Sequence, residues 1–253
     1  MRLVDAVRGV CTPQYVFRPG QIVRRMLWRG RRRDRPTVTA RLAWGMPIRC
    51  YPSDPIGLGM QQLGVFELRV AEILARLADP GETALDVGAN VGQMTALLAL
   101  RLGPSGRVVA FEPADGVRAT LEQNAAAWRA GWPVAAIDVR PVALSDRDGA
   151  GELLLPAFYD HNRGLARVAA PGEGDADGGS RQPLRLARLD GLLGADTPVG
   201  VMKIDVEGHE GPVLRGAGVL LAAGRIRDIV FEDHGGYPTD VSRLLEGFGY
   251  RVF

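Results

Sequence analysis

Acidic side chains stand where apolar segments of this chain end, and small residues follow the first of them. The stretch DVGANVG begins at Asp86 and continues through Gly88, Asn90 and Gly92. Missing or minimal side chains in such a turn let a ligand approach the backbone closely. Glu112 ends the next apolar run, 26 residues after Asp86, and an acid in that place accepts both hydrogen bonds of a ribose diol. The spacing therefore predicts a nucleoside site at the carboxyl edge of a parallel sheet.

The glycine spacing selects among the nucleosides. A dinucleotide site needs G-x-G-x-x-G, and a phosphate loop needs G-x-x-x-x-G-K-[ST]. Neither pattern is present, and the only lysine is Lys203. An acid that opens the loop, as Asp86 does, suits a cationic ligand, and S-adenosylmethionine carries an ammonium and a sulfonium. The D-x-G-x-N-x-G spacing is similar to the first motif of Rossmann-like class I methyltransferases, and it predicts S-adenosylmethionine as the cofactor.

A second set of reactive side chains lies in the segment VMKIDVEGHE. Asp205, Glu207 and His209 alternate there, and a strand places alternate side chains on one side. An alcohol is a poor nucleophile at neutral pH, so a positioned base contributes about 10²–10⁴-fold to methyl transfer. His209 titrates nearest neutrality. We predict that His209 or Asp205 is the base and that Glu207 orients substrate or base. The alternative is that Glu207 and His209 cap a helix starting at Glu210.

Alternating strand and helix patterns position these residues. Strands are predicted over Thr83 to Val87, Arg107 to Phe111, Val134 to Leu144, Gly200 to Val206 and Ile226 to Asp233. Helices are predicted over Phe66 to Leu77, Val91 to Leu102, Ala114 to Ala130, Glu210 to Ala222 and Val241 to Phe248. This alternation predicts an α/β fold with a doubly wound, mainly parallel sheet of the Rossmann-like class I methyltransferase type. An inserted hairpin is expected from Glu152 to Phe158 and from Leu184 to Leu189.

Residues 1–64 are expected to form a basic N-terminal extension, and residues 65–253 the methyltransferase domain. A hairpin is predicted over Thr37 to Cys50 and a loop over Tyr51 to Gly64, where prolines and glycines gather. The first 50 residues hold twelve arginines and two aspartates, a net charge of +10 in a chain whose total is +2. Such a segment predicts attraction to anionic membrane or to phosphate-bearing molecules. Aromatic residues are missing from residues 29–35, which makes RNA the weaker candidate.

Composition sets further bounds. No run approaches the roughly 18 apolar residues that span a bilayer, and the N-terminus lacks the continuous apolar core of a signal peptide. Cys11 and Cys50 are two isolated thiols, too few for a disulfide framework. We therefore expect a cytoplasmic protein that contacts the inner membrane face peripherally through its arginine-rich segment.

Several motifs together resemble the FkbM family of methyltransferases. They are DVGANVG, FEP at Phe111 to Pro113, LEQN ending at Asn124, ALSD ending at Asp146, and MKIDVEGHE followed by VLRGA. The resemblance extends from about Phe66 to the C-terminus, and MKIDVEGHE is its most specific part. It implies O-methylation dependent on S-adenosylmethionine, typically of sugar hydroxyls or of hydroxyls on polyketides and other natural products.

The resemblance also assigns cofactor contacts. The cofactor turn would consist of Asp86, Gly88, Asn90 and Gly92, and Glu112 would hold the ribose. Ser145 and Asp146 would lie near the adenine, because a carboxylate at a third strand end can accept a hydrogen bond from the exocyclic amine. Capping of a turn is the alternative for Asp146. Glu67 would face the methionine end of the cofactor, or else be an ordinary acid at a helix start.

Other positions could meet the acceptor or a metal. Asn162, in HNRGLA, resembles a family stretch that could contact substrate or a lid, and a plain turn is its alternative. Glu232 could contact substrate. A divalent cation is left open, because oxygen and imidazole groups suited to Mg²⁺ or Mn²⁺ gather near two strand ends. These groups belong to Asp205, Glu207, His209, Glu232, Asp233 and His234.

The end of the sequence departs from the family pattern. Family members usually continue past the positions of Gly249 and Tyr250 and close the sheet with a final strand, whereas this sequence ends at Phe253. We expect that antiparallel edge to be absent, partial, or supplied by the hairpin at Thr37 to Cys50.

The sequence thus predicts an O-methyltransferase acting on a hydroxyl of a sugar, a glycan, or a glycosylated or polyketide natural product. One alternative is methylation of nitrogen in protein or RNA, although the N-P-P-[YF] type of tetrapeptide is replaced by DVEG at Asp205 to Gly208. Another is a non-catalytic module that binds a nucleoside or a glycan. A nicotinamide dehydrogenase is excluded by the glycine spacing.

Overall fold

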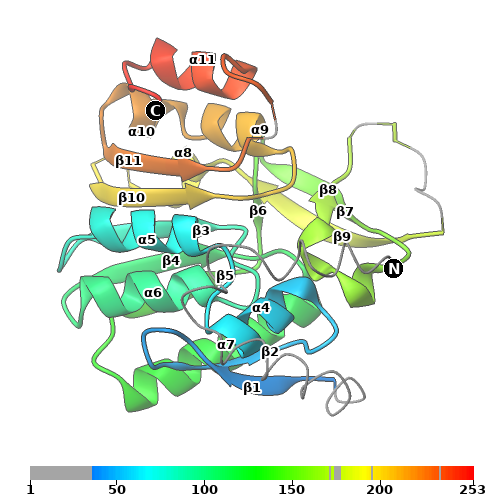
Figure 1. The fold of residues 1–253 in the computed structure, drawn as a ribbon. Helices are drawn as coiled ribbons and strands as arrows, with labels where there is room; N and C mark the ends of the chain where they lie inside the picture. Colours follow the sequence, from blue (N-terminus) through cyan, green and yellow to red (C-terminus); the bar gives the residue numbers. More distant parts are fainter. Residues whose placement is uncertain (1–35, 171, 174–177, 195, 234) are drawn as a thin grey trace, which may run out of the picture.

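Five parallel strands form the centre of the protein (Figure 1). The computed structural model describes residues 36–170, 172–173, 178–194, 196–233 and 235–253. The strand order is β11–β10–β3–β4–β5, which is the doubly wound arrangement predicted from the alternation of strands and helices. The bounds are Thr83–Val87 for β3, Arg107–Phe111 for β4, Ala136–Arg140 for β5, Val199–Ile204 for β10 and Ile226–Phe231 for β11.

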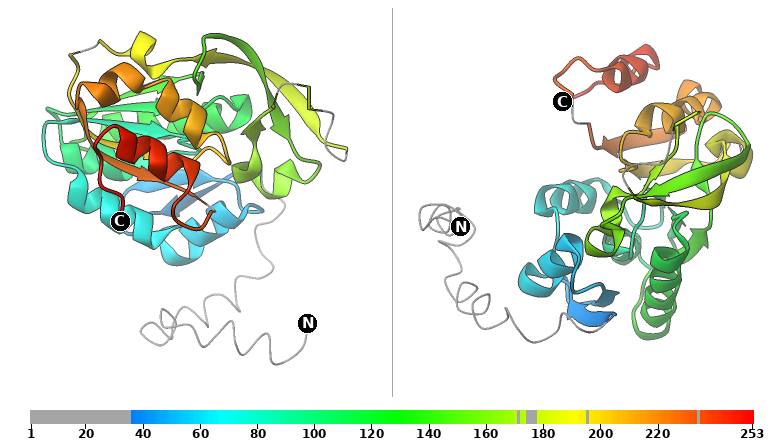
Figure 2. Two further views of the ribbon diagram at one scale, coloured as in Figure 1. Left: turned by 90° about the horizontal axis from the view of Figure 1, so that it is seen from above. Right: turned by 90° about the vertical axis from the view of Figure 1, so that its right-hand side faces the viewer.

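Helices cover both faces of this sheet (Figure 2). One face carries α5 (Leu68–Leu77), α6 (Gln93–Leu102) and α7 (Asp115–Gly131). The other carries α8 (Leu189–Leu192), α9 (Glu210–Arg215), α10 (Gly218–Ala222) and α11 (Asp240–Gly247). Neighbouring residues of a strand point to opposite faces, so Ala84 of β3 packs with the first group of helices and Leu85 with the second. Burial on both faces explains why the inner strands β10, β3 and β4 are nearly continuous apolar runs.

The predicted N-terminal hairpin is confirmed as β1 (Val38–Arg41) paired with β2 (Pro47–Cys50). It packs against α7, where the Trp128 indole donates to the Pro47 carbonyl at 2.6 Å. The Asn124 amide bonds both the N–H and the carbonyl of Arg49, at 2.8 and 2.9 Å. The hairpin therefore shares the core of the main sheet. The arginine-rich segment before it falls in residues 1–35, outside the described residues.

The loop predicted from Tyr51 to Gly64 is wrong, because Pro55–Leu63 forms helix α4. Asp54 caps this helix through a 2.8 Å hydrogen bond from the Ile56 N–H, and Pro55 occupies its first turn, where a missing N–H costs nothing. Gly57 serves close packing, since a Cβ there would lie 1.9 Å from the Tyr51 carbonyl oxygen. The residues that suggested a loop thus have helical roles, because Pro55 begins α4 and Gly57 lets it pack closely on Tyr51.

Two further predictions of a single element are wrong, because the structure has two elements in each segment. The strand expected over Val134 to Leu144 is split into β5 and a short β6 (Ala143–Leu144), which belongs to a second sheet. The helix expected over Glu210 to Ala222 is broken between α9 and α10. Gly216 lies at the break, where a Cβ would come within 1.9 Å of the Ser145 carbonyl oxygen. Close tertiary contact, which local periodicity does not encode, causes this break.

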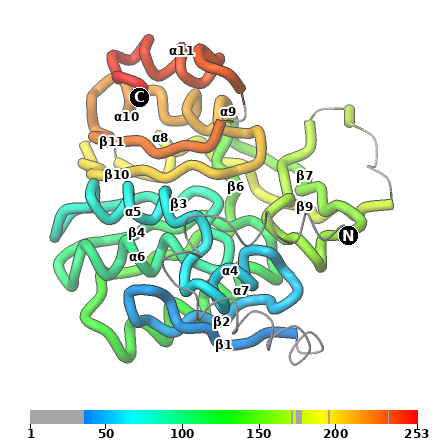
Figure 3. The backbone as a smooth tube through the Cα atoms, viewed as in Figure 1, coloured from blue at the N-terminus to red at the C-terminus, as the bar shows by residue number. Residues whose placement is uncertain are grey.

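The second sheet has the order β6–β9–β7–β8 and projects beside the central one (Figure 3). Its strands β7 (Gly149–Leu155) and β9 (Ser180–Ala187) are antiparallel and confirm the inserted hairpin. The short helices η1 (Tyr159–His161) and η2 (Arg163–Leu165) follow β7 and lead to β8 (Arg167–Val168). Among the described residues after α11 no strand forms, and β1–β2 remains a separate sheet, so β11 is the edge of the central sheet.

None of the helices in the described part of the chain has the length and apolar character required to cross a membrane.

Replacing Asp54 with alanine should destabilise the protein by about 2 kcal/mol. The carboxylate is 2% exposed. Its second oxygen accepts from the Arg163 N–H at 2.7 Å, so the change removes a helix cap and a tie to η2 together. Urea denaturation measures the effect. Asp115→Ala is the matched control, since that exposed first-turn acid only pairs with Arg118 and should cost less than about 1 kcal/mol. Equal losses in both variants would contradict the assignment.

Candidate functional site

Three carboxylates occupy equivalent positions at the carboxyl edge of the central sheet. Glu112, Asp205 and Glu232 each follow the last residue of β4, β10 and β11. The backbone ladder continues through them, because the Asp205 N–H donates to the Val87 carbonyl at 3.1 Å and the Glu232 N–H to the Ile204 carbonyl at 3.0 Å. Strand register therefore places the three acids in one row, as parallel strands require.

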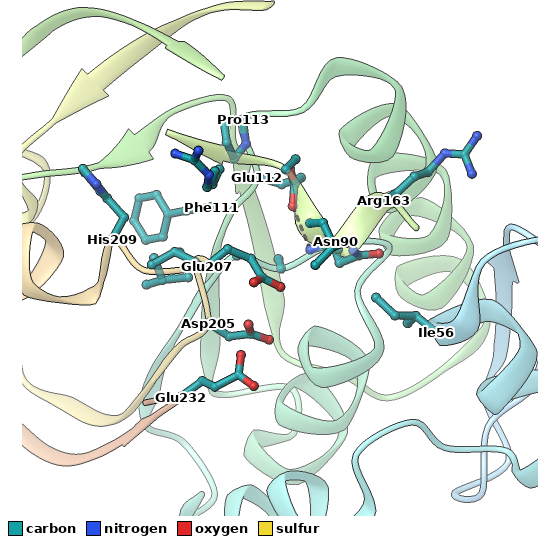
Figure 4. A pocket seen from close by; sticks show the side chains of 18 of the residues that line it. Ile56, Asn90, Phe111, Glu112, Pro113, Arg163, Asp205, Glu207, His209 and Glu232 are labelled. Carbon is teal, nitrogen blue, oxygen red and sulfur yellow. Dashed lines mark hydrogen bonds between the residues drawn. The ribbon is translucent and has the colours of Figure 1, made fainter. Parts of the chain in front are cut away.

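A cavity of about 220 Å³ opens above this row (Figure 4). Its floor is the strand ends, and its walls come from α4, the turn before α6, residues 142–144 and residues 162–168. Nine of the residues predicted for cofactor, substrate or catalysis line it, namely Glu67, Gly88, Asn90, Glu112, Asn162, Asp205, Glu207, His209 and Glu232.

The two glycines of the turn have different tasks. Gly88 has φ +76, and a Cβ there would lie 1.9 Å from the Asp205 carbonyl oxygen, so glycine lets β3 and β10 end side by side. Gly92, with φ +95, does not line the cavity. A Cβ there would come within 2.4 Å of Leu121, so this glycine allows α6 to begin against α7. Gly92 thus has a packing role, and its expected cofactor contact stays a prediction.

Glu112 is held rigidly beside the turn. One carboxylate oxygen accepts from the Asn90 N–H and the other from the Ala114 N–H, both at 2.8 Å. Burial raises the pKa of Glu112 to about 7, although these two N–H groups favour the ionised form. The carboxylate is therefore preorganised and titrates near neutrality.

Asp86 does not line the cavity, and its expected contact with the cofactor stays a prediction. It is fully buried, and its Oδ2 accepts a 2.5 Å hydrogen bond from the Thr95 hydroxyl on α6. The cause is the length of β3, which continues to Val87 and leaves Gly88 in the row of strand ends. Asp86 instead stabilises the turn from its buried side, through the hydrogen bond with Thr95.

Lys203 is the cation that pairs with the buried Asp86, a role that the sequence motifs did not predict. Its Nζ donates to the Gly88 carbonyl at 2.8 Å and lies 3.2 Å from Asp205 Oδ2 and 3.5 Å from Asp86 Oδ1. Burial alone would lower the pKa of Lys203, but Asp205 and Asp86 raise it above its usual value. The available signal was its place two residues before Asp205 in a strand, which puts both side chains on the same side.

Asp205, Glu207 and Glu232 form a carboxylate triad. One oxygen from each lies within 4.8 Å of the others, and Figure 4 shows the three carboxylates side by side in the cavity. Oxygen ligands of this kind suit a divalent cation. His209 and Asp233, from the wider metal set considered above, are not in this group, and His234 lies outside the described residues.

His209, Ser145 and Asp146 lie to one side of the triad. The His209 Nε2 is 3.0 Å from the Ser145 hydroxyl, and burial lowers the pKa of His209. Asp146 forms a 3.0 Å ion pair with Arg215. Neither Ser145 nor Asp146 lines the cavity. The adenine contact expected of these two residues stays a prediction.

Residues 86–252 match the family model described as the methyltransferase FkbM domain. This chain belongs to the FkbM methyltransferase family. The match confirms the resemblance carried by DVGANVG and MKIDVEGHE. In this FkbM methyltransferase, Glu67, α4 and the hairpin precede the matched residues.

Solved structures with similarity to the chain include two further methyltransferases and a candidate rRNA methylase. The candidate rRNA methylase, from Clostridium thermocellum, has 13% identity and a TM-score of 0.42, over 71% of this chain and 76% of its own. A methyltransferase FkbM from Methylobacillus flagellatus has 15% identity and a TM-score of 0.40, over 63% of this chain and 39% of its own. A SAM-dependent O-methyltransferase from Thermotoga maritima has 24% identity and a TM-score of 0.27, over 42% and 41%. A search among curated proteins found no significant match.

In this FkbM methyltransferase, Lys203→Met should lower the free energy of unfolding by about 3–5 kcal/mol, because it leaves the buried Asp86 and the half-buried Asp205 without their cation. Chemical denaturation measures the loss. Arg76→Met serves as control, since its exposed pair with Glu72 should contribute less than about 1 kcal/mol. A loss at position 203 no larger than that of the control would contradict a central role for this lysine.

Proposed function

We propose that this FkbM methyltransferase takes its methyl group from S-adenosylmethionine and transfers it to a hydroxyl of a sugar, a glycan, or a glycosylated or polyketide natural product. The observation that carries the proposal is the placement of Glu112 and the carboxylate triad around one cavity. A candidate ribose-binding acid thus stands at the end of β4, and a group of candidate proton acceptors stands at and just beyond the ends of β10 and β11, with β3 between them. Cofactor binding and removal of a hydroxyl proton both have candidate residues there.

The cavity lining fits a cationic adenosyl compound. Glu112 would accept the ribose hydroxyls, and Gly88 leaves the backbone open nearby. Glu67 would face the methionine end. Lys203 is ion-paired with Asp205 and Asp86, so it does not offset the remaining acids, and the potential favours a ligand with net positive charge. S-adenosylmethionine supplies an electrophilic methyl group on a positively charged sulfur.

We assign Asp205 as the base. The proton of the acceptor hydroxyl passes to its carboxylate while the oxygen bonds to the methyl carbon, and the electron pair of the broken C–S bond stays on sulfur. Glu207 and Glu232 would accept hydrogen bonds from neighbouring hydroxyls, which favours a polyhydroxylated acceptor. His209 is the second candidate base, but its Nε2 is engaged with the Ser145 hydroxyl.

Methylation of RNA has less support from the same cavity. Its acids would repel a phosphate backbone, and binding of nucleic acid depends on uncommitted cations. Among the lining residues, Lys203 is paired with Asp205 and Asp86, Arg167 with Glu173, and Arg163 with Asp160. Nitrogen in protein and a purely binding function for nucleosides or glycans remain the alternatives that experiment must separate.

Calorimetric titration with S-adenosylmethionine, S-adenosylhomocysteine and NAD tests the cofactor. We expect the first two to bind and NAD not to bind, and the reverse result would contradict the proposal. A screen of sugars, glycans, peptides and RNA with methyl-labelled cofactor then tests the acceptor. Label recovered on oxygen of a sugar supports the proposal, label on nitrogen supports the first alternative, and cofactor binding without transfer to any acceptor supports a binding module.

A chelator separates two functions of the carboxylate triad. If EDTA abolishes transfer and Mg²⁺ or Mn²⁺ restores it, the triad holds a divalent cation that could lower the pKa of the acceptor hydroxyl. If transfer is unchanged, the triad acts directly on the acceptor. Cofactor titration under the same conditions shows whether any loss lies in binding or in chemistry.

The affinity for S-adenosylhomocysteine should fall as the pH falls below about 7, where the raised pKa of Glu112 lets its carboxyl take up a proton. An ionised carboxylate accepts both ribose hydrogen bonds and a protonated one does not. The dissociation constant should therefore rise by up to about tenfold per pH unit on the acid side and level off above neutrality. In Glu112→Gln the affinity should be weak and flat over this range. Parallel profiles for the two proteins would contradict the ribose assignment.

Asp205→Asn should lower kcat by about 10²–10⁴-fold, because the amide cannot take up the acceptor proton. We expect a smaller fall in kcat for His209→Gln. Turnover is measured at saturating cofactor, with thermal denaturation to correct for any loss of folded protein through the Lys203 contact. If kcat falls further in His209→Gln than in Asp205→Asn, the base is His209 and not Asp205.

A further inference from the structure

Among the described residues, three non-glycine residues adopt a left-handed backbone, and all three line the cavity. They are Glu67, Asn90 and Glu207, with φ of 52°, 51° and 54°. Asparagine tolerates this conformation, whereas glutamate rarely adopts it. Such strain persists only where the surrounding structure imposes it, and it gathers at functional sites.

Gln93 holds the backbone next to Glu67. Its Oε1 accepts from the Phe66 N–H at 2.7 Å, and its Nε2 donates to the Phe66 carbonyl at 2.6 Å. The side chain is 6% exposed and belongs to the first residue of α6, directly after the cofactor turn. Glu67 precedes α5 but makes no capping hydrogen bond to it. Capping therefore does not explain its conformation, whereas Gln93 holds both the N–H and the carbonyl of the residue directly before it.

Glu210 holds the backbone on both sides of Glu207. One of its carboxylate oxygens accepts from the Val206 N–H at 3.2 Å and from the Gly208 N–H at 3.3 Å. Glu210 is 7% exposed and is the first residue of α9. It corresponds in place to Gln93, since each begins the helix that follows a strand of the central sheet. Neither residue has a role in the sequence motifs considered above.

We propose that Gln93 and Glu210 are positioning residues, which fix Glu67 and Glu207 in left-handed conformations that present them to the cavity. Without these contacts each glutamate relaxes to an ordinary backbone conformation, and its carboxylate leaves its place. Gln93 then controls the cofactor end of the cavity, and Glu210 controls the acceptor end. This assignment of ends rests on the proposed function.

Two measurements test the proposal. The ¹³Cα and ¹³Cβ chemical shifts of Glu67 and Glu207 report their φ angles, and calorimetry gives the dissociation constant of S-adenosylhomocysteine. In Gln93→Leu we expect Glu67 to lose its left-handed signature and the dissociation constant to rise roughly 10- to 100-fold, as misplacement of a binding group does. In Glu210→Ala the signature of Glu207 should be lost while cofactor affinity stays close to that of the wild type.

Conservative variants separate positioning from general stability. Glu210→Gln keeps an acceptor oxygen and should retain the wild-type signature of Glu207. In Gln93→Glu the ionised carboxyl cannot donate to the Phe66 carbonyl, so affinity should be weak at neutral pH. The affinity of Gln93→Glu should recover relative to that of the wild type as the pH falls, because the introduced carboxyl then gains a proton.

Asp190→Ala is the matched control. Its carboxylate also accepts two backbone N–H groups, those of Val219 and Leu220 at 2.9 and 3.1 Å, but away from the cavity. The proposal is overturned if the left-handed signatures survive in Gln93→Leu and Glu210→Ala. It is also overturned if Gln93→Leu weakens binding no more than Asp190→Ala does. If the wild type does not bind S-adenosylhomocysteine, the proposed function fails, and the chemical shifts still decide whether the two contacts fix the glutamates.

Discussion

A single buried ammonium group joins the two halves of the candidate site. Lys203 bonds the Gly88 carbonyl and lies between Asp86 and Asp205, so the cofactor turn and the end of β10 share one cation. Two carboxylates this close would repel each other strongly in a dry environment without it. The charge of Lys203 allows Asp86 to hold the turn from beneath while Asp205 faces the cavity. The turn whose Asn90 N–H holds Glu112 and the strand end that carries Asp205 are therefore tied together by one cation.

Much of the fold follows from local pattern. The inner strands of the central sheet were predictable because each is an apolar run that ends at a turn, and the alternation of strands with helices indicates a parallel sheet. Errors occurred where tertiary contact overrides local signals. Helix α4 contains the prolines and glycines expected of a loop, because Gly57 packs directly on Tyr51. Gly216 interrupts a helical pattern for the same kind of reason, at the Ser145 carbonyl.

The candidate site was predictable to the extent that it lies at strand ends. Glu112, Asp205 and Glu232 occupy one row because parallel strands finish together. Asp86 was expected in the same row, but it lies one residue inside β3, whose bounds were predicted correctly, and its buried side chain contacts Thr95 and Lys203. The roles of Lys203 and Gln93 were not predicted because they depend on contacts with distant backbone, and that of Glu210 was not predicted because it depends on how the turn before α9 folds back onto it. Only the folded chain brings Gln93 to Phe66, 27 residues away in sequence.

A structure of the protein with S-adenosylhomocysteine bound is the most direct test of the central claim. We expect the ribose hydroxyls to bind the Glu112 carboxylate and the sulfur of S-adenosylhomocysteine to lie in the cavity above the ends of β3 and β10. The Asp205 carboxylate should lie on the side from which an acceptor hydroxyl would enter. A ligand seated away from Glu112, or a cavity that stays empty at saturating ligand, would contradict it.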